Sequence, residues 1–595
     1  MIDNIFGNQI EFDNSLGKHR EKRIGIHHFN QIDPPDPLPD QPIEIRCTTG
    51  GPMPFESIYC FFTTDGSDPG NTEANVIELS QVSSVWDDLD WSYVRNWRIT
   101  LPPSASGTMI RYKIAGRVVG SNHWVYADNQ ADTSQAGTEF TIYVDNDSTP
   151  VWAHKAIVYH IFVDRFYPGD GKRWNETNSL LDFFGGTIRG VIDKLDYIQE
   201  LGFNTIWLSP FFKTTSHHGY NASDYYSVEP RLGTNSDIKE LINQAHRRGL
   251  RILLDFVANH WSKDHPTFQD AIRNPRSKYH DWYFWRHWPD DYVAYFDVKE
   301  LPSVNLRPGP AREEMLNIAQ FWLKEGFDGY RLDYASGPSF DFWPYFRRAC
   351  RTVNPECWLF GEVVQDAESQ RVFAGRLDGT LDFLLARSLR ETFAFGRMTL
   401  AELEAFLKGH EAYFPPGFNR PSFLDNHDMS RFYYISGMEK KKLQLAALML
   451  YTLENPPIIY YGTESGLSQD RPMQQGDRYV FEEARLPMDW ENQDSELINF
   501  FTKLNELRRS HPVLVNGTRL LIHLDSENGT YGYIRKDGAE TVLVLFNLSN
   551  SLREIKLPIS GIPAKAIDHL NGLQVGIHSG AVEISLPART GAFIS

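Results

Sequence analysis

The sequence predicts a multidomain protein in which a (β/α)8 (TIM) barrel is flanked by two β-sandwiches. The chain of 595 residues is long enough for two to four domains, of which a barrel alone can take more than about 200 residues. Between about residues 151 and 508, compact apolar runs alternate with longer helical patterns, as in repeated βα units. The segments before and after carry short strand-like runs divided by turn-rich stretches, which is typical of all-β domains.

The first segment, residues 1–150, is predicted to form an N-terminal β-sandwich. Its clearest strand candidates are residues 57–62 and 109–114, where apolar residues cluster or alternate with polar ones. Residues 145–150 combine Asp, Asn, Ser and Pro and are expected to form the linker to the next domain.

The second segment, residues 151–508, is predicted to form the barrel. Eight strand candidates lie near residues 157–163, 205–208, 252–257, 329–333, 358–361, 380–383, 422–425 and 458–461. Functional groups of such a barrel lie at the carboxyl ends of its strands. An aromatic-rich insertion at about 261–312 follows the third strand and is expected to wall one side of a cleft. Residues 509–595 return to β patterning, which predicts a C-terminal β-sandwich.

Charge and composition exclude several classes of function. The formal net charge of −18, without a dense basic patch, argues against binding to nucleic acid or to an anionic membrane surface. No window approaches the roughly 18 apolar residues of a membrane helix, and no signal peptide is seen. We therefore expect a cytoplasmic protein. The four cysteines lack metal-type spacing and are expected to be buried free thiols.

Three acidic residues fall at or just beyond predicted strand ends: Asp333, Glu362 and Asp428. In a closed barrel these ends converge on one mouth, so carboxylates distant in sequence can share a small volume. Like charges held this close raise at least one pKa, which can keep one group protonated as an acid.

Arg331 lies two residues before Asp333, so strand periodicity points both side chains to the same side. Its positive charge is expected to keep Asp333 ionised, as a nucleophile requires. A protonated Glu362 facing an ionised Asp333 is the pair needed for glycoside cleavage. Each carboxylate taken alone would more often be a helix cap or a salt-bridge partner, but their joint placement favours a catalytic site.

The sequence also resembles a known family, the α-amylase family of retaining glycoside hydrolases and transglycosylases. The resemblance covers about residues 151–595. It is carried by four segments in the family's order: DFVANH at 255–260, GYRLD at 329–333, GE at 361–362 and DNHD at 425–428. Supporting matches are IFVDRF at 161–166, GFNTIWLSP at 202–210, and HGY at 218–220 with DY at 224–225.

The resemblance implies a role for each site residue. Asp333 resembles the nucleophile, Glu362 the general acid/base and Asp428 the transition-state stabiliser. The substrate-binding residues implied by the family pattern are Tyr220, His218, His260, Arg331, His427 and Asp255, with Tyr220 stacking on the sugar ring and Asp255 orienting Arg331.

Within the family, residues 301–305 (LPSVN) resemble the segment that marks cyclomaltodextrinases, neopullulanases and maltogenic amylases. The N-terminal domain fits that subgroup as a carbohydrate-binding-like module, and by analogy a homodimer is possible. Two positions depart from the subgroup: Gly337 replaces a usual acidic residue, and residues 363–365 (VVQ) replace a typical Trp-His. Both are expected to face the sugars on the leaving-group side.

The expected activity is hydrolysis of α-glucosidic, mainly α-1,4, bonds in maltodextrins, cyclodextrins, pullulan or starch. A glucanotransferase or isomerase using the same intermediate is one alternative, and a non-catalytic glucan-binding protein is another. No cofactor is expected to be required. A structural calcium is possible, with Asp164 and Asp170 as weak candidate ligands near the first barrel strand.

Overall fold

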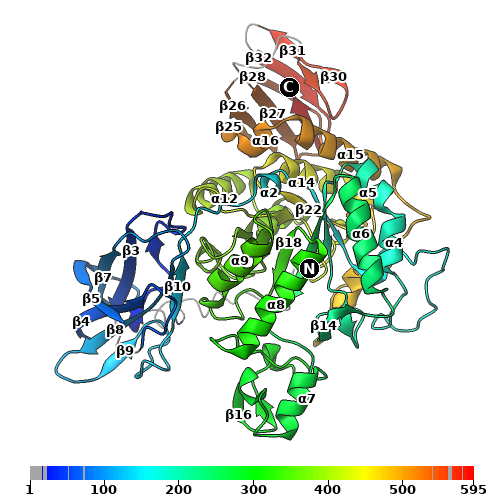
Figure 1. The fold of residues 1–595 in the computed structure, drawn as a ribbon. Helices are drawn as coiled ribbons and strands as arrows, with labels where there is room; N and C mark the ends of the chain where they lie inside the picture. The colour runs from blue at the N-terminus through cyan, green and yellow to red at the C-terminus, as the bar shows by residue number, and fades with distance from the viewer. Residues whose placement is uncertain are drawn as a thin grey trace.

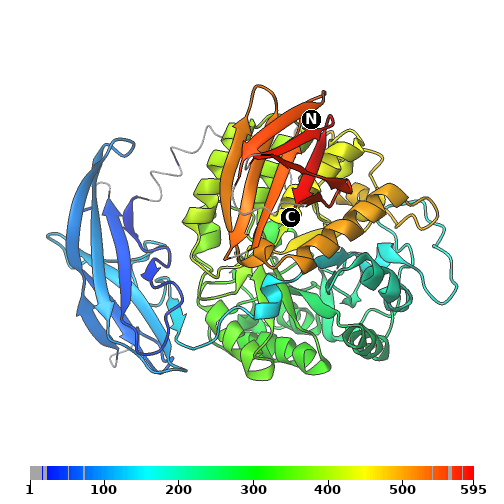
Figure 2. The ribbon, with the colours of Figure 1, turned by 90° about the horizontal axis from the view of Figure 1, so that it is seen from above.

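The computed structural model describes residues 17, 23–50, 53–70, 74–538, 540–559, 566–578 and 581–595. Its elements form an N-terminal pair of sheets, a central barrel ringed by helices, and a C-terminal pair of sheets (Figure 1). The expected fold class is therefore confirmed. Viewed from above, the N-terminal domain stands to one side of the barrel (Figure 2).

Eight parallel strands form the barrel, in the order β20-β19-β18-β15-β12-β11-β22-β21. Hydrogen bonds between residues 378–382 and 419–421, including a parallel bridge between Gly379 and Asn419, join the two ends of this path and close the sheet. In chain order the strands are β11 (Val158–Ile161), β12 (Thr205–Leu208), β15 (Arg251–Val257), β18 (Gly329–Asp333), β19 (Trp358–Gly361), β20 (Gly379–Thr380), β21 (Ser422–Phe423) and β22 (Pro457–Tyr460).

Helices between the strands cover the outside of the barrel (Figure 1). Most barrel strands are fully buried and strongly apolar, because helices cover one face and the packed barrel interior covers the other. The helices are α4 (Ile188–Asp193), α5 (Leu195–Leu201), α6 (Asn235–Arg247), α8 (Pro310–Glu325), α9 (Phe342–Val353), α10 (Ala367–Arg371), α11 (Phe383–Leu389), α12 (Leu400–Tyr413), α13 (Phe432–Ile435), α14 (Lys440–Thr452) and α15 (Ser495–Ser510).

All eight strand candidates overlap observed strands, but three extend too far: the first reaches the start of α3 (Val163–Phe166), the seventh passes the end of β21 by two residues, and the sixth passes the end of β20 by three. The expectation was a strand over 380–383, but β20 ends at Thr380. The side chain of Asp382 accepts a hydrogen bond from the backbone amide of Leu385 and caps helix α11. An apolar run that contains Asp can therefore start a helix as well as continue a strand.

The N-terminal domain consists of two antiparallel sheets. The first has the order β1-β3-β7-β6 with β2 beside β3, and the second the order β10-β8-β4-β5 with β9 beside β8. Their strands are β1 (Gly25–His27), β2 (Ile32–Asp33), β3 (Ile43–Gly50), β4 (Phe55–Thr63), β5 (Asn75–Glu78), β6 (Ser80–Asp87), β7 (Ser92–Leu101), β8 (Met109–Val118), β9 (Trp124–Tyr126) and β10 (Phe140–Tyr143).

The C-terminal domain also has two sheets, with the orders β25-β26-β27-β33-β29-β30 and β28-β32-β31. The division expected after residue 508 falls inside α15. The strands are β25 (Thr518–Asp525), β26 (Thr530–Asp537), β27 (Glu540–Asn547), β28 (Arg553–Pro558), β29 (Ile567–Asp568), β30 (Leu573–Gln574), β31 (Gly576–His578), β32 (Ala581–Leu586) and β33 (Thr590–Ile594).

Three excursions extend from the carboxyl ends of barrel strands. The hairpin β13 (Phe212–Thr214) and β14 (Ala222–Val228) follows β12, and the hairpin β23 (Gln474–Gln475) and β24 (Arg478–Tyr479) follows β22. The insertion after β15 holds α7 (Pro266–Arg273) and the hairpin β16 (Trp285–His287) and β17 (Asp291–Tyr292). This insertion and the C-terminal domain lie at opposite ends of the molecule in Figure 1.

In the described ranges, no helix is both long and apolar enough to span a membrane. The four cysteines are buried and free.

Candidate active site

The acidic residues predicted from the sequence are delivered by neighbouring strand ends. Asp333 is the last residue of β18, Glu362 directly follows β19, and Asp428 lies in the loop after β21. Asp255 lies near the end of β15, opposite Arg331 in the β15–β18 register. Because parallel strands of a barrel point their carboxyl ends to one rim, these side chains meet there.

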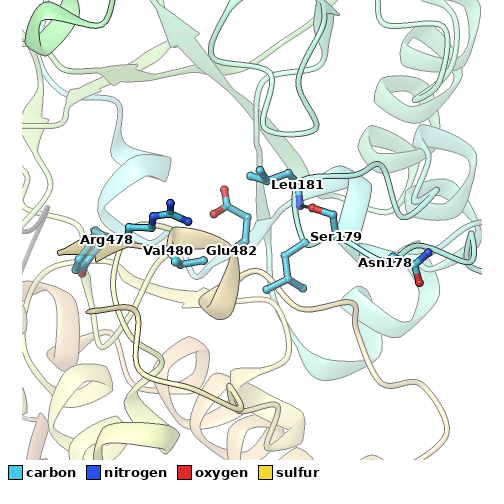
Figure 3. A pocket seen from close by; sticks show the side chains of 8 residues that line it. Asn178, Ser179, Leu181, Arg478, Val480 and Glu482 are labelled. Carbon is cyan, nitrogen blue, oxygen red and sulfur yellow. Dashed lines mark hydrogen bonds between the residues drawn. The ribbon is translucent and has the colours of Figure 1, made fainter. Parts of the chain in front are cut away.

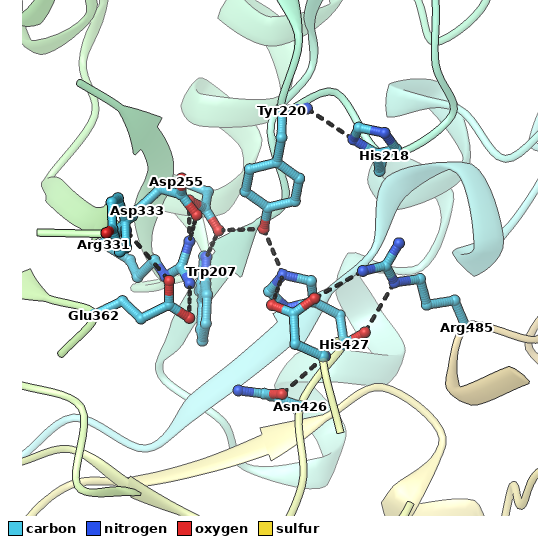
Figure 4. Close-up of polar contacts among 12 residues, drawn as sticks. Trp207, His218, Tyr220, Asp255, Arg331, Asp333, Glu362, Asn426, His427 and Arg485 are labelled. Carbon is cyan, nitrogen blue, oxygen red and sulfur yellow. Dashed lines mark hydrogen bonds and ion pairs between the residues drawn. The ribbon is translucent and has the colours of Figure 1, made fainter. Parts of the chain in front are cut away.

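Arg331 lies at the centre of the cluster and contacts three carboxylates. Its Nη1 donates to Asp255 Oδ1 at 2.7 Å and to Asp333 Oδ1 at 2.9 Å. Its Nη2 lies 2.5 Å from Glu362 Oε1. Figure 4 shows the guanidinium between Asp255, Asp333 and Glu362. The proposed nucleophile and acid therefore flank a single guanidinium group, which fixes where both carboxyls lie.

A second set of contacts connects this cluster to the loop after β21. The Tyr220 hydroxyl donates to Asp255 Oδ2 at 3.0 Å and lies 2.6 Å from His427 Nε2. Since the hydroxyl has a single proton, its contact with His427 requires Nε2 to carry hydrogen. The Tyr220 and His427 rings stack with centroids 5.4 Å apart. Trp207 Nε1 also donates to Asp255 Oδ2, at 3.1 Å. Asp255 therefore accepts hydrogen bonds from Trp207, Tyr220 and Arg331 and fixes their positions relative to one another.

Asp428 is held between two positively polarised groups. Its Oδ2 lies 2.9 Å from His427 Nε2, and its Oδ1 accepts from Arg485 Nη2 at 2.7 Å. Arg485 also donates through Nε to the carbonyl of His427, at 2.8 Å. Sequence reasoning missed Arg485, because it follows β22 by more than twenty residues and no strand pattern places it at the rim.

Burial dominates the acid–base behaviour of the two central carboxyls. Asp333 is 7% exposed and Glu362 is 3% exposed. Desolvation raises the pKa of both, and their neighbouring carboxylates raise it further, while Arg331 opposes the shift. The expectation that Arg331 keeps Asp333 ionised stays a prediction, because burial and Arg331 shift the pKa of Asp333 in opposite directions. One guanidinium is shared among three carboxylates, so its effect on the pKa of Asp333 is divided, whereas desolvation raises that pKa.

Asp428 behaves in the opposite way. Burial alone would raise its pKa, but the ion pairs with His427 and Arg485 outweigh burial and hold the pKa below its ordinary value. The cluster therefore combines one carboxylate with a lowered pKa, Asp428, with three carboxyls whose pKa burial raises: Asp255, Asp333 and Glu362. Such coupled groups titrate as a unit.

The two other histidines predicted to bind substrate contact the Tyr220 loop. His218 Nδ1 accepts from the Tyr220 amide at 3.1 Å, which leaves Nε2 as the protonated nitrogen; burial lowers the pKa of His218 to about 3. His260 Nε2 lies 3.1 Å from the Tyr220 carbonyl, and burial lowers the pKa of His260 to about 4. Both rings are therefore neutral, and they fix the position of the half-buried Tyr220.

The candidate calcium ligands have surroundings that do not fit a metal site. Asp164 accepts from Arg165 Nε at 2.9 Å and from the amides of Phe184 and Gly185, so its oxygens already have donors. Asp170 is exposed and lies 3.8 Å from Lys172. Within the part of the chain that the structure describes, no group of three or more His, Cys, Asp or Glu residues could hold a metal. Calcium binding stays a prediction without a ligand set.

The two departures from the subgroup pattern lie on the Glu362 side of the site. A Cβ on Gly337 would lie 2.2 Å from Asn259 Oδ1 and 2.5 Å from the Tyr334 ring, so the close packing of these loops explains the glycine. Gln365 Nε2 lies 3.3 Å from Ser336 Oγ, which joins the loops after β18 and β19 at the rim.

The structure is a closed (β/α)8 barrel in which two buried carboxyls, Asp333 and Glu362, lie at strand ends and contact the same arginine. Such a pair of carboxyls is the arrangement of a glycoside hydrolase. Comparison with known proteins gives the same class. The family model for the α-amylase catalytic domain matches residues 160–495. The chain belongs to the α-amylase family and is a glycoside hydrolase of the cyclomaltodextrinase and neopullulanase type.

Relatives cover most of the chain. The chain is 34% identical to "Alpha-amylase 2" of Dictyoglomus thermophilum over 551 residues, which is 92% of each protein. It is 30% identical to "Neopullulanase 2" of Thermoactinomyces vulgaris over 77% of this chain and 80% of that protein. A solved structure of a cyclomaltodextrinase aligns with 96% of this chain and 99% of its own, at a TM-score of 0.71 and 24% identity, which supports the fold.

Proposed function

We propose that the protein hydrolyses α-glucosidic bonds, mainly α-1,4, in maltodextrins and related glucans with retention of anomeric configuration. The observation that carries the proposal is Arg331, which holds Asp333 and Glu362 on two nitrogens of one guanidinium group. The names of the relatives add cyclodextrins and pullulan to the candidate substrates.

In the first step, an oxygen of ionised Asp333 forms a bond to the anomeric carbon, and the bond from that carbon to the leaving oxygen breaks. Glu362 donates its proton to the leaving oxygen. In the second step, Glu362 takes a proton from water, whose oxygen displaces Asp333. The raised pKa of Glu362 suits the acid role. Because the carboxyls titrate together, the proton kept by the cluster has to be on Glu362 when Asp333 attacks.

Asp428 remains ionised through its pairs with His427 and Arg485, and it would stabilise positive charge that develops at the anomeric carbon. Tyr220 lies above this point with its ring stacked on His427 and supplies an apolar face for the sugar.

The test uses a panel of soluble starch, pullulan, cyclodextrins and maltooligosaccharides. Asp333→Asn should lower kcat by at least about a thousandfold, because the covalent step is lost. Asp196→Asn is the matched control, since Asp196 is exposed and pairs with Arg248 away from the cluster.

Glu362→Gln with an α-maltosyl fluoride should accumulate a glycosyl-protein adduct visible by mass spectrometry. Fluoride leaves without an acid, whereas the second step still needs a base. Inverted products, or an Asp333→Asn variant with the rate of the unmodified protein, would refute the assignment. Products longer than the substrate would show that the glycosyl group is transferred from Asp333 to a second sugar instead of to water. Binding without turnover on every glucan would indicate a non-catalytic binding protein.

A further inference from the structure

One buried histidine inside the barrel takes no part in the chemistry above. His160 on β11 is fully buried, and in the register of the sheet it pairs with Trp207 on β12 and with Tyr460 on β22. Its ring stacks on Trp207, with ring centroids 3.6 Å apart and an angle of 5° between the planes. Its centroid lies 4.9 Å from that of the Tyr460 ring. Three neighbouring strands therefore bring three rings into contact at one level of the barrel.

Packing explains the ring of His160 but not its nitrogens. Neither Nδ1 nor Nε2 has a hydrogen-bond partner among the residues that the structure describes. Buried polar atoms are nearly always paired, because an unpaired one loses its hydrogen bonds to water without compensation. A phenylalanine ring could stack on Trp207 without this loss. The two nitrogens therefore indicate a polar partner nearby.

His427 carries the complementary unpaired atom. Its Nε2 carries the hydrogen that faces the Tyr220 hydroxyl and Asp428 Oδ2. Its Nδ1 is buried and has no partner in the described part of the chain. The His160 and His427 rings meet edge to face, with centroids 5.2 Å apart and an interplanar angle of 81°. The unpaired nitrogens thus belong to two rings that are in contact.

His160 stays neutral at this position. Burial lowers its pKa well below the ordinary value, and positive charge on His427 and Arg331 lowers it further. A neutral imidazole has one N–H donor and one acceptor nitrogen. His160 can therefore pair with Nδ1 of His427 without bringing another charge into the site.

A different contact holds Asp428 from the segment after β22. Arg485 Nη2 donates to Asp428 at 2.7 Å, and its Nη1 donates to Glu482 at 3.2 Å. Glu482 lines a cavity of about 570 Å³ (Figure 3). Arg485 therefore holds Asp428 from the side of this cavity, whereas His160 contacts the neighbouring His427 from the barrel interior.

We infer that His160 is a positioning residue of the catalytic cluster. Its nitrogens provide the polar partner of His427 Nδ1, directly or through a shared water molecule, and so keep the opposite N–H of His427 on Asp428 and the Tyr220 hydroxyl. This inference rests on the proposed function, because it takes Asp428 as the group that stabilises charge at the reacting carbon. That charge develops in the transition state, so loss of the support lowers kcat more than it raises KM.

The test measures kcat and KM on the glucan that the unmodified protein cleaves fastest. His160→Phe keeps a ring on Trp207 and removes both nitrogens, whereas His160→Gln keeps polar atoms and removes the ring. We expect His160→Phe to lower kcat about tenfold with KM within about twofold, as for one lost hydrogen bond, and His160→Gln to recover at least about half of the kcat. In a His427→Asn background, His160→Phe should lower kcat by less than about twofold, since it acts through His427.

Tyr460→Phe is the matched control. Tyr460 is equally buried in the same layer, its ring contacts His160, and its hydroxyl also lacks a partner within the described ranges. Because Tyr460 has no assigned role in the cluster, this variant should keep kcat within about twofold. A loss in Tyr460→Phe equal to that in His160→Phe would assign the effect to packing of the layer and overturn the inference.

Two other results would also overturn it: an unchanged kcat in His160→Phe, or the same loss with and without His427. If circular dichroism shows that His160→Phe is unfolded, His160→Gln decides, since near-full kcat supports the polar role and an about tenfold lower kcat overturns it. Absence of turnover by the unmodified protein on every glucan would instead overturn the proposed function, and this inference with it.

Discussion

Asp333 shows how a single residue can serve function at the expense of stability. It is a buried carboxyl whose guanidinium partner, Arg331, also contacts Asp255 and Glu362. Its pKa is raised, first by desolvation and then by the neighbouring carboxylates. Burial destabilises the ionised form of Asp333 while Arg331 stabilises it, and the destabilisation would favour attack on an electrophilic carbon by the nucleophile proposed above.

We predict that Asp333→Asn stabilises the fold at neutral pH. The pKa of Asp333 is higher in the folded than in the unfolded protein. Between these two pKa values the folded state binds more protons, so the free energy of unfolding falls as the pH rises. At pH values above the folded pKa, each unit by which the folded pKa exceeds the unfolded pKa lowers the free energy of unfolding by about 1.4 kcal/mol. Asn cannot ionise, so the variant should avoid this loss.

Chemical denaturation of both proteins across pH measures the effect. The difference in unfolding free energy should be largest at neutral pH and disappear below about pH 3.9, where both side chains are neutral. Asp196→Asn should stay within about 0.5 kcal/mol of the unmodified protein. A variant less stable than the unmodified protein at neutral pH would contradict the prediction.

Strand ends predicted part of the cluster from the sequence. Asp333 and Glu362 lie at the ends of β18 and β19, and strand geometry brings such residues to one rim. Asp255, Tyr220 and the histidines were implied by the resemblance to the family. Arg485 and Glu482 come from a long irregular segment, whose path depends on tertiary packing. The sharing of Arg331 among three carboxylates was also not predictable, since it depends on distances of a few ångströms.

At the scale of elements, the loops after β15 and β18 are pressed together at the rim. Gly337 lies against Asn259 and Tyr334, with no room for a Cβ. Asn259 Nδ2 in turn lies 3.3 Å from His260 Nδ1, and Tyr334, directly after Asp333, has a positive φ of 43°. The absence of a side chain at position 337 therefore supports the placement of His260.

We predict that Gly337→Ala lowers kcat by about tenfold while the protein stays folded. The added methyl must displace the Asn259 amide or the Tyr334 ring, which costs about 1–3 kcal/mol in a packed region. Loss of the Asn259 contact frees His260 to rotate away from the Tyr220 carbonyl. Kinetics on maltotriose with circular dichroism as the check on folding measure this effect.

Gly409→Ala is the control for this substitution, because a Cβ there meets open space on α12. Full activity of Gly337→Ala would show that the two loops yield without moving His260. The subgroup's usual acidic residue at position 337 would need still more room, which explains in physical terms why this chain departs from the pattern.

At the scale of the whole molecule, several arginines of the barrel contact the N-terminal domain. Arg376 Nη2 donates to Asn30 Oδ1, Arg348 lies over the Tyr143 ring, and Arg347 makes the contacts given next. Arg347 on α9 is 1% exposed. Its guanidinium contacts Asp36 Oδ1 at 3.0 Å, Asp145 Oδ1 at 3.5 Å and the carbonyl of Asp147 at 2.8 Å, all from the N-terminal segment. It also donates to the barrel carbonyl of Gly375 at 3.0 Å. No pattern in the sequence marks Arg347, because its partners lie about 200 to 300 residues away.

We predict that Arg347→Met loosens the N-terminal domain from the barrel. Removing one member of a buried ion pair leaves its partner unpaired, which typically costs about 3–5 kcal/mol. Burial already raises the pKa of Asp145 to about 6, so its carboxylate depends on Arg347 for compensation. Limited proteolysis should then cut near residues 145–150 at a protease concentration that leaves the unmodified protein intact.

Arg273→Met is the control, since Arg273 is an exposed arginine of α7 that donates to Gln269 Oε1 and has no contact with the N-terminal domain among the described residues. The denaturation midpoint should fall for Arg347→Met and change little for Arg273→Met. Because the catalytic cluster draws only on barrel strands and their loops, the kcat of intact Arg347→Met should remain within about twofold. Equal protease resistance in the two variants would show that contacts other than the Arg347 network, such as Arg376 with Asn30, hold the domain in place.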